Sequence, residues 1–375
     1  MKPNPAHRER IADIADVRQY TLIRSADPAV APCTDPQPSP EASLNVLITG
    51  GAGYIGRFCV RELVAAGHDV VVLDQRPLSS IDGTSAVASI TGEIGDAALV
   101  RRALDDHDVD VVLHLAAEKS VGDSMVAPGH HLLRNVTGSL VLFEAMLARG
   151  VRRIVFSSSA AVYGTPRRVP VDEAADLAPD NPYGAGKVMV EQSLHWYAVC
   201  HGFDTVSLRY FNAAGAAEDG SLGEDGPEVT NLVPRVMRAL AGVGDPVPLY
   251  GTDYPTPDGT AVRDYVHVED LARAHVHALE LVADGSGERA YNLGTGKGVS
   301  VRQVLDAAER ASGRPVPHVE AARRPGDPPA VWADAGAAAR DLGWRAERTI
   351  DDIVRSAWLW QQRIGPPGDG PRRDG

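Results

Sequence analysis

A tyrosine and a lysine stand four residues apart in the segment NPYGAGKVMVE, at Tyr183 and Lys187. If this segment is helical, the two side chains lie one turn apart on the same face. A phenol has an ordinary pKa of about 10, and a nearby cation lowers that pKa, which would make the phenolate a general base. The pair alone does not decide this, because the same spacing arises by chance about once in every two or three chains of this length.

A glycine turn, TGGAGYIG, follows the first predicted strand and has Gly50, Gly53 and Gly56 spaced three apart. Glycine there lets the backbone bend tightly and lets a pyrophosphate approach the helix N-terminus, although the spacing is not the G-x-G-x-x-G form. The second predicted strand ends at Asp74, where a carboxylate would bind an adenosine ribose and repel a 2′-phosphate. The pattern predicts NAD rather than NADP, with the alternative that Asp74 only caps a strand end.

A serine run, SSSAAVYG, ends the fifth predicted strand, 24 residues before Tyr183. Ligands of open α/β sheets bind at the carboxyl ends of the strands, so Ser159 is expected at the edge of the cleft. Its hydroxyl would hydrogen-bond the group whose proton Tyr183 takes, and Lys187 would bond the nicotinamide ribose. Serine runs in loops are usually inert, so the prediction depends on the combination with the Tyr–Lys pair and the glycine turn.

Composition and charge limit the function classes. The chain has 375 residues and a formal net charge of −13, which argues against a nucleic-acid or anionic-membrane surface. Its three cysteines, Cys33, Cys59 and Cys200, have no paired spacing, so we expect a reducing compartment and no metal site. No apolar run approaches the roughly 20 residues that span a bilayer. The sequence predicts a cytoplasmic protein with neither a membrane nor a nucleic-acid partner.

Strands and helices alternate through the first half of the chain. We expect strands over 44–50, 68–74, 86–94, 109–117, 151–159 and 204–210, and helices over 54–67, 96–107, 135–150 and around Tyr183. Most of these strands are continuous apolar runs, which is typical of a parallel sheet covered on both faces. The fold class is therefore α/β, a doubly wound (Rossmann-like) parallel sheet. A later helix opens with SVRQ, in which Ser300 and Gln303 would form a capping box.

The chain divides into unequal parts. Residues 1–43 are polar and rich in proline, which predicts a flexible leader, although 8–23 admits a short helix. Residues 44–211 are predicted to form the Rossmann-like domain. From residue 212 the pattern breaks into loops, short strands and helices, so 212–363 is expected to be a smaller mixed α/β lobe, with later segments returning to the first domain. The tail, 364–375, is predicted to be disordered.

Eight motifs together resemble the extended short-chain dehydrogenase/reductases, and within them the UDP-glucose 4-epimerases (also called UDP-galactose 4-epimerases). The motifs are TGGAGYIG, SSSAAVYG, NPYGAGK, LRYFNAAGA, TNLVPRV, YGTDYPTPDGTAVRDYVHVEDLA, YNLGTG and RRPGDPPAVWAD. The resemblance covers about residues 44–363, and the long stretch that contains RDYVHV is the most specific to the epimerases. It implies NAD binding by residues 44–211 and nucleotide-sugar binding mainly by residues 212–363.

The resemblance also implies which residues form the site. The catalytic residues would be Ser159, Tyr183 and Lys187. The NAD site would comprise Gly50, Gly53, Tyr54, Ile55, Gly56, Asp74, Glu93, Ile94, Leu115, Ala116, Ala117, Lys119, Asn135, Ser157, Tyr183, Lys187 and Tyr210. The UDP-sugar site would comprise Lys119, Ser159, Tyr183, Asn212, Asn231, Leu232, Tyr250, Arg263, Arg324, Asp327 and Val331. Arginines suit this role because they clamp phosphate oxygens with two parallel hydrogen bonds.

The implied reaction is an inversion at C4 of the hexose. The Tyr183 phenolate takes the proton of the 4-hydroxyl while NAD⁺ takes the hydride, and the 4-keto sugar then turns and accepts the hydride on its other face. The chain departs from the family at Glu93, where Asp is usual, at Ala117, where Gly is usual, and at Glu118, which is usually apolar. The segment APGHHLLRNV also lacks the tyrosines that usually precede the asparagine.

Two other classes of function are compatible with parts of this pattern. One is another nucleotide-sugar enzyme of the same superfamily, a UDP-uronate or UDP-pentose 4-epimerase or a 4,6-dehydratase. A dehydratase needs an acid and a base after the strand-end hydroxyl, whereas this chain has Ala160 and Ala161. The other is a non-catalytic NAD-sensing module, which typically loses the Tyr or the Lys.

The resemblance finally implies an assembly and a substrate range. The 135–150 helix and the Tyr183 helix carry more apolar residues than one core face needs, among them Val188, Met189, Trp196 and Val199. In the family these helices pair across a two-fold axis, so we expect a homodimer. Val331 aligns with a position that is bulky and aromatic in enzymes restricted to plain hexoses. The smaller valine predicts that N-acetylated hexoses are also accepted, with the alternative that Val331 is only packing.

Overall fold

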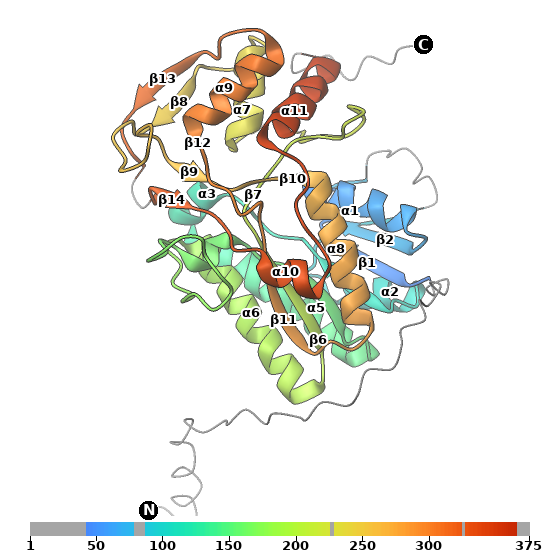
Figure 1. Cartoon of the computed structure of the whole chain (residues 1–375). Helices are drawn as coiled ribbons and strands as arrows, with labels where there is room; N and C mark the ends of the chain where they lie inside the picture. Colours follow the sequence, from blue (N-terminus) through green and yellow to red (C-terminus); the bar gives the residue numbers. More distant parts are fainter. Residues whose placement is uncertain (1–42, 79–86, 226–228, 325–326, 366–375) are drawn as a thin grey trace, which may run out of the picture. The chain divides into compact units, whose positions relative to one another are not determined.

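Figure 1 shows the computed structural model, which describes residues 43–78, 87–225, 229–324 and 327–365. Nearly all of the predicted leader and tail, and the helix admitted over 8–23, lie outside the described residues. Within the described part of the chain, no helix is long and apolar enough to cross a membrane.

A seven-stranded sheet forms the centre of the fold, and all of its strand pairs are parallel. In the order of the sheet its strands are β11 (Glu288–Leu293), β6 (Asp204–Tyr210), β5 (Arg153–Ser157), β4 (Val111–His114), β1 (Asn45–Thr49), β2 (Asp69–Asp74) and β3 (Ala88–Thr91). After β1 the chain adds β2 and β3 on one side, and from β4 onwards it adds strands on the other side. The boundary between β1 and β4 is therefore the switch point at which doubly wound sheets bind ligands. The predicted Rossmann-like class is confirmed, and the six strands expected from the sequence are all present.

Helices cover both faces of this sheet because successive strand residues point to opposite sides. Val46 and Ile48 of β1 pack with α1 (Tyr54–Ala65) and α8 (Val268–Ala283), which lie side by side in Figure 1. Leu47 of the same strand packs on the other face with α2 (Ala97–Asp106), α5 (Gly138–Arg149) and α6 (Pro182–His201). Residues buried on both faces explain why the strands read as continuous apolar runs.

Local signals fix the ends of several helices. Gly67, with a φ of +88°, follows the last turn of α1 as expected from the sequence. The Asn181 side chain caps α6 by accepting a hydrogen bond from the N–H of Gly184 at 2.9 Å, and Pro182 occupies the first position. The predicted capping box of Ser300 and Gln303 is present at α9 (Val301–Ser312). Because the cap fixes where α6 begins, it also fixes Tyr183 in the first turn.

The helix expected over 135–150 begins differently in the structure. Two short helices, α3 (Val121–Val126) and α4 (Pro128–Leu132), lead into a π-helical turn at Leu133–Thr137, and only then does α5 start. A π turn inserts one extra residue per turn and is frequent at functional sites. Apolar periodicity continues through the turn, which is why the sequence alone indicated one regular helix.

The C-terminal half contributes smaller sheets and a separate core. α7 (Leu232–Leu240), α9 and α11 (Ile350–Ile364) enclose this core with the parallel pair β8 (Val247–Tyr250) and β13 (His318–Ala321). A three-stranded sheet joins β12 (Val299–Ser300), β9 (Val262–Arg263) and β14 (Ala330–Val331), and β7 (Asn212–Ala214) pairs with β10 (Tyr265–His267). Between these segments the chain returns to the large sheet as α8 and β11, and α10 (Gly336–Asp341) contacts β11.

Candidate active site

Tyr183, Lys187 and Ser159 meet at the carboxyl end of β5. Tyr183 and Lys187 occupy successive turns of α6 and are only 9% and 5% exposed. The Lys187 Nζ donates a 2.6 Å hydrogen bond to the Ser157 carbonyl and lies 5.8 Å from the centre of the Tyr183 ring. Ser159 caps the 3₁₀ turn Ala160–Tyr163, and its hydroxyl interacts with the Tyr183 phenol. The structure therefore brings the three predicted catalytic residues together.

Burial governs the titration of this group. It raises the pKa of Tyr183, and the interaction with Ser159 only partly lowers that pKa again. Burial also lowers the pKa of Lys187 to about 8, against the raising effect of the Glu191 carboxylate. The sequence suggested that Lys187 would lower the Tyr183 pKa. In the structure the net direction is upwards, because desolvation of the phenolate outweighs the lowering effect of Ser159.

A buried ion pair lies next to the predicted catalytic residues. Glu191, one turn after Lys187 on α6, accepts hydrogen bonds from the Arg209 guanidinium on β6, the shortest being 2.6 Å from Nη2. The Ser158 hydroxyl donates to the same carboxylate at 2.5 Å. The Arg209 Nη1 also donates to the Tyr163 hydroxyl at 3.0 Å. Four segments around Ser159 are thereby tied to one another.

The glycine turn packs too closely for side chains. Gly50 has a φ of +76°, and a Cβ on it would lie 2.6 Å from the amide nitrogen of Ala116, at the end of β4. A Cβ on Gly56 would lie 2.3 Å from the Gly50 carbonyl oxygen. Gly53 is the N-cap of α1 and has no side chain to cap the helix. This turn presents main-chain N–H groups at a helix N-terminus, the arrangement that binds pyrophosphates.

The Asp74 carboxylate holds this turn against the end of β2. Its Oδ2 accepts a hydrogen bond from the Ala52 N–H at 3.0 Å, and its Oδ1 accepts one from the Arg76 N–H at 2.9 Å. A carboxylate has about four acceptor positions, and these two hydrogen bonds use two of them. Asp74 can therefore cap the strand end and still accept hydrogen bonds from an adenosine ribose, so both interpretations are compatible with this geometry. The neighbouring Arg76 guanidinium donates to the Ala52 carbonyl at 3.0 Å.

Asn135, in the π-helical turn, forms two hydrogen bonds to the main chain of the segment that follows β4. Its Oδ1 accepts from the Glu118 N–H at 2.8 Å, and its Nδ2 donates to the Glu118 carbonyl at 3.0 Å. The same Nδ2 lies 2.9 Å from the Nε2 of His131, whose ring packs edge-on against Tyr183 at 5.9 Å. Sequence reasoning missed His131 as part of the site. Its position one turn before Asn135 was the available signal.

The remaining predicted cofactor residues surround these groups. The Tyr54 hydroxyl donates to the Gly215 carbonyl at 2.6 Å, and Ser157 and Tyr210 share a hydrogen bond of 3.0 Å. The exposed Glu93 forms an ion pair with Arg134 at 3.2 Å. The other predicted cofactor residues have apolar side chains. Ile55 and Ile94 pack against the two cores of the large sheet, and Leu115, Ala116 and Ala117 follow β4.

Five of the predicted nucleotide-sugar residues lie on or next to β8, β9 and β14, namely Tyr250, Arg263, Arg324, Asp327 and Val331. Arg263 on β9 forms an ion pair with Asp327 and pairs in register with the buried Val331 of β14. The Arg324 guanidinium stacks 3.9 Å above the centre of the Tyr250 ring, and this arginine lowers the pKa of the phenol most strongly. A cationic, partly aromatic cluster of this kind suits a nucleoside diphosphate.

Arg235 also lowers the Tyr250 pKa and belongs to the same cluster, although the sequence did not single it out. It lies on α7, one turn after Asn231, so helical spacing was the signal. Asn231, the N-cap of α7 ahead of Leu232, and Lys119 both contact the Glu224 carboxylate. Asn212 is exposed at the start of β7, and its N–H donates to the Asp264 carbonyl. Its described contacts do not link it to the arginine cluster.

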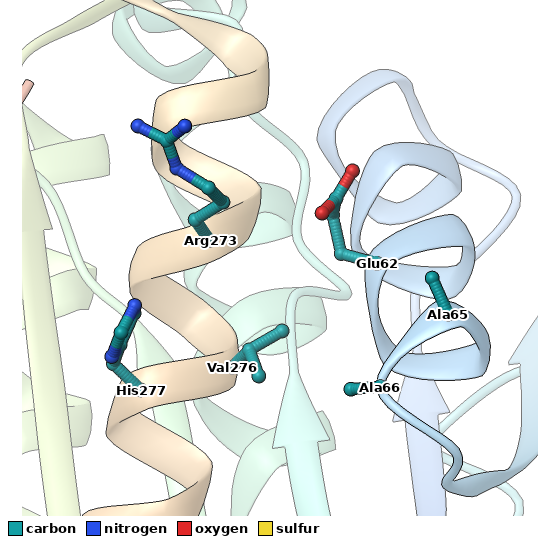
Figure 2. A pocket seen from close by; sticks show the side chains of 6 residues that line it. All are labelled: Glu62, Ala65, Ala66, Arg273, Val276 and His277. Atoms are coloured by element: carbon teal, nitrogen blue, oxygen red, sulfur yellow. The ribbon is translucent and has the colours of Figure 1, made fainter. Parts of the chain in front are cut away.

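A pocket with a volume of about 270 Å³ opens between α1 and α8 (Figure 2). Glu62, Ala65, Ala66, Arg273, Val276 and His277 line it. None of the predicted site residues, all of which lie in the described ranges, contributes to this lining. Within those ranges, no three or more His, Cys, Asp or Glu side chains are grouped to hold a metal ion.

Comparison with known proteins decides the family. The model of the NAD dependent epimerase/dehydratase family matches residues 46–294, from β1 to the end of β11. The chain belongs to this family. Within the NAD dependent epimerase/dehydratases, it is 44% identical to the UDP-glucose 4-epimerase of Azospirillum brasilense over 341 residues, covering 88% of this chain and 98% of the relative.

Two solved structures of this epimerase group have a similar fold. The UDP-glucose 4-epimerase of Bifidobacterium longum, in complex with NAD⁺ and UDP, has a TM-score of 0.81 at 42% identity, covering 85% of this chain and 98% of that one. The UDP-Glc/GlcNAc 4-epimerase of Campylobacter jejuni has a TM-score of 0.75 at 34% identity, covering 86% and 99%. The resemblance found in the motifs is therefore confirmed over most of the chain.

Proposed function

We propose that this protein is an NAD-dependent 4-epimerase of a UDP-hexose, interconverting UDP-glucose and UDP-galactose through a transient 4-keto sugar. The observation that carries the proposal is the buried Tyr183 beside Ser159, with Lys187 one turn below it and anchored to the Ser157 carbonyl at 2.6 Å. Only a site with a proton acceptor and a hydride acceptor can open and re-form the carbinol C–H bond without net oxidation.

The protein's own residues handle the proton. The Tyr183 oxygen takes the proton of the sugar 4-hydroxyl and later returns it, while the Ser159 hydroxyl hydrogen-bonds the same oxygen of the sugar. Lys187 contributes positive charge close to the phenol, and the carbonyl contact fixes its ammonium. Bound NAD would supply the hydride acceptor, held by the glycine turn with Asp74 at the adenosine ribose. Its cationic ring would add positive charge to that of Lys187.

Binding energy for the substrate would come mainly from the nucleotide. Arg235, Arg263 and Arg324 would bind the diphosphate, and Asp327 would orient the Arg263 guanidinium with which it pairs. Because these groups hold the nucleotide, the hexose can turn between hydride removal and return. Departure of a 6-hydroxyl, as in a dehydratase, would need an acid and a base near Ser159, where Ala160 and Ala161 cannot transfer protons.

The substrate range would include N-acetylated hexoses. Val331 is buried in a small cluster with Val162, Tyr163 and Phe211, which also suits the alternative that it is only packing. Its side chain is smaller than an aromatic ring, so it would leave more room in a sugar pocket. The similar structure of the UDP-Glc/GlcNAc 4-epimerase supports this extension. An acetamido group on C2 would occupy the space left at Val331.

The active form would be a cytoplasmic homodimer. α6 exposes Met189, Trp196 and Val199, and the adjoining π-helical turn exposes Leu133. These side chains would be covered by the same helices of a second copy, because apolar groups of this size gain by leaving water.

The test is a panel of UDP-sugars incubated with the purified full-length protein and NAD, followed by NMR at C4. Conversion of UDP-galactose to UDP-glucose is the expected result. UDP-glucuronate and UDP-xylose in the same panel separate uronate and pentose epimerases. The proposal fails if no UDP-hexose is inverted. Inversion of only UDP-glucuronate or UDP-xylose would favour a uronate or pentose epimerase, and NAD binding without any inversion would favour an NAD-sensing module.

A further inference from the structure

Glu224 lies where three parts of the candidate site meet. Its Oε1 is 2.8 Å from the ammonium of Lys119, which follows β4, and 3.3 Å from the side-chain nitrogen Nδ2 of Asn231, the N-cap residue of α7. The carboxylate is 13% exposed, whereas the Lys119 side chain is 61% exposed. Lys119 and Asn231 are two of the predicted substrate residues, and Glu224 was not among them.

The main chain around Glu224 is held from two sides. Arg57, directly after the last glycine of the glycine turn, donates to the Gly223 carbonyl at 2.7 Å and forms a 2.9 Å ion pair with Asp225. From α11, the indole N–H of Trp360 donates to the Glu224 carbonyl at 3.0 Å. A Cβ on Gly223 would lie 2.4 Å from the Trp360 ring, so a larger residue here would displace the indole.

These contacts indicate that Glu224 sets the position of Lys119, and not the reverse. The backbone of Glu224 is fixed by α1 and α11, and its side chain is mostly shielded from solvent. Lys119 is a long side chain that is otherwise open to water and has many rotamers. The carboxylate therefore determines where the ammonium rests, and the Asn231 amide is oriented by the same group.

We propose that Glu224 is a positioning residue that holds the Lys119 ammonium and the Asn231 amide ready for the UDP-sugar. This inference rests on the proposed epimerase function and deepens it. A substrate that meets two ordered donors does not have to order them itself, so the gain appears in binding. Arg57 follows the glycine turn and contacts both neighbours of Glu224. The residue that positions Lys119 and Asn231 is therefore itself held by the segment predicted to bind the cofactor.

The ordinary alternative is a surface ion pair of little consequence. Another is that the carboxylate competes with the anionic substrate for the same two donors. The three interpretations predict different signs for the change in KM when the charge of Glu224 is removed: a rise for positioning, no change for a passive pair, and a fall for competition.

The experiment is a double-mutant cycle in the full-length NAD-loaded protein, with UDP-galactose as substrate. Glu224→Gln is expected to raise KM about 5–10-fold, or about 1–1.4 kcal/mol, with kcat within about twofold. In a Lys119→Met background the same substitution is expected to change KM less than it does in the wild type, because only the Asn231 contact remains to be lost. Glu218→Gln is the matched control, since it removes a carboxylate from the same loop but one that pairs with Arg348.

Circular dichroism and bound-NAD absorbance check that each variant is folded, and Glu224→Asp serves as the second variant if Glu224→Gln is not. An unchanged or lowered KM overturns the proposal, as does an equal effect in both backgrounds. If the wild type does not epimerise UDP-galactose, the proposed function fails. The Kd for UDP of the same four proteins is then measured by calorimetry. A rise in Kd on removing the Glu224 charge supports positioning, and an unchanged or lowered Kd overturns it.

Discussion

Removing Arg209 tests whether the buried ion pair supports the site as the structure indicates. Arg209 and Glu191 are both buried, and the guanidinium donates to both carboxylate oxygens, at 3.0 and 3.2 Å from Nε and 2.6 Å from Nη2. In Arg209→Met, the carboxylate keeps only the 2.5 Å hydrogen bond from Ser158. Methionine keeps the unbranched apolar stem of Arg209 and removes the guanidinium.

The expected loss is set by the charge left behind. Breaking a buried pair by removing one partner costs about 3–5 kcal/mol, because the other charge stays desolvated without compensation. Replacing both partners by neutral groups costs much less. We therefore expect Arg209→Met to lower the free energy of unfolding by about 3–5 kcal/mol, and Arg209→Met with Glu191→Gln to recover at least about half of that loss. The glutamine keeps an acceptor for Ser158.

The assay is urea unfolding at pH 7.5, followed by far-UV circular dichroism, with the same saturating NAD in every sample because bound cofactor stabilises the folded state. The midpoint and the m-value are compared for the wild type and both variants. A loss below about 1 kcal/mol in the single variant would refute the reasoning. So would a double variant that is less stable than the single one.

Four further outcomes are expected. Tyr183→Phe should lower kcat by about 10²–10⁴-fold and still bind NAD and UDP, because only the proton-transfer oxygen is lost; near wild-type turnover would rule out the assignment. Lys187 has a folded pKa of about 8, below its unfolded value of about 10.4, so the unfolded state binds more protons between these values. The free energy of unfolding of the NAD-free protein should thus rise with pH across that window relative to Lys187→Met, and parallel curves would contradict this. Val331→Tyr should reduce kcat/KM for UDP-N-acetylgalactosamine relative to UDP-galactose, and an unchanged ratio would mean that the position is misassigned. Light scattering at micromolar concentration should give twice the chain mass, and Trp196→Glu should shift it towards one chain; a wild type already at the mass of one chain would exclude the dimer.

The large sheet and the helix that carries Tyr183 and Lys187 were predictable because their signals are local. The glycine turn, the apolar strands and the Asn181–Pro182 start of α6 each lie within a few residues of what they determine. The carboxyl ends of parallel strands lie at one edge of the sheet, which is why the sequence alone placed Ser159 at the edge of the cleft.

What the sequence did not predict depends on segments far apart in the chain. Glu224 contacts Lys119 across 105 residues, and no local pattern announces the pairing. The raised pKa of Tyr183 is a consequence of burial, which depends on the packing of several elements. The π-helical turn before α5 was missed because apolar periodicity continues through it, while its hydrogen bonds follow a different spacing. The domain division at residue 212 stays a prediction.

The late return of the chain to the large sheet has a consequence for synthesis on the ribosome. The apolar face of α1, with Phe58 and Leu63, is covered by Leu271 and Leu279 of α8, and the edge of β6 is paired by β11. Translation proceeds from the N-terminus, so the first six strands leave the exit tunnel before either cover has been made. Until residue 293 emerges, the nascent chain presents an open strand edge and an uncovered apolar surface, both of which favour aggregation. Ribosome pausing between β6 and β11 would lengthen this exposed period and increase the demand for chaperones.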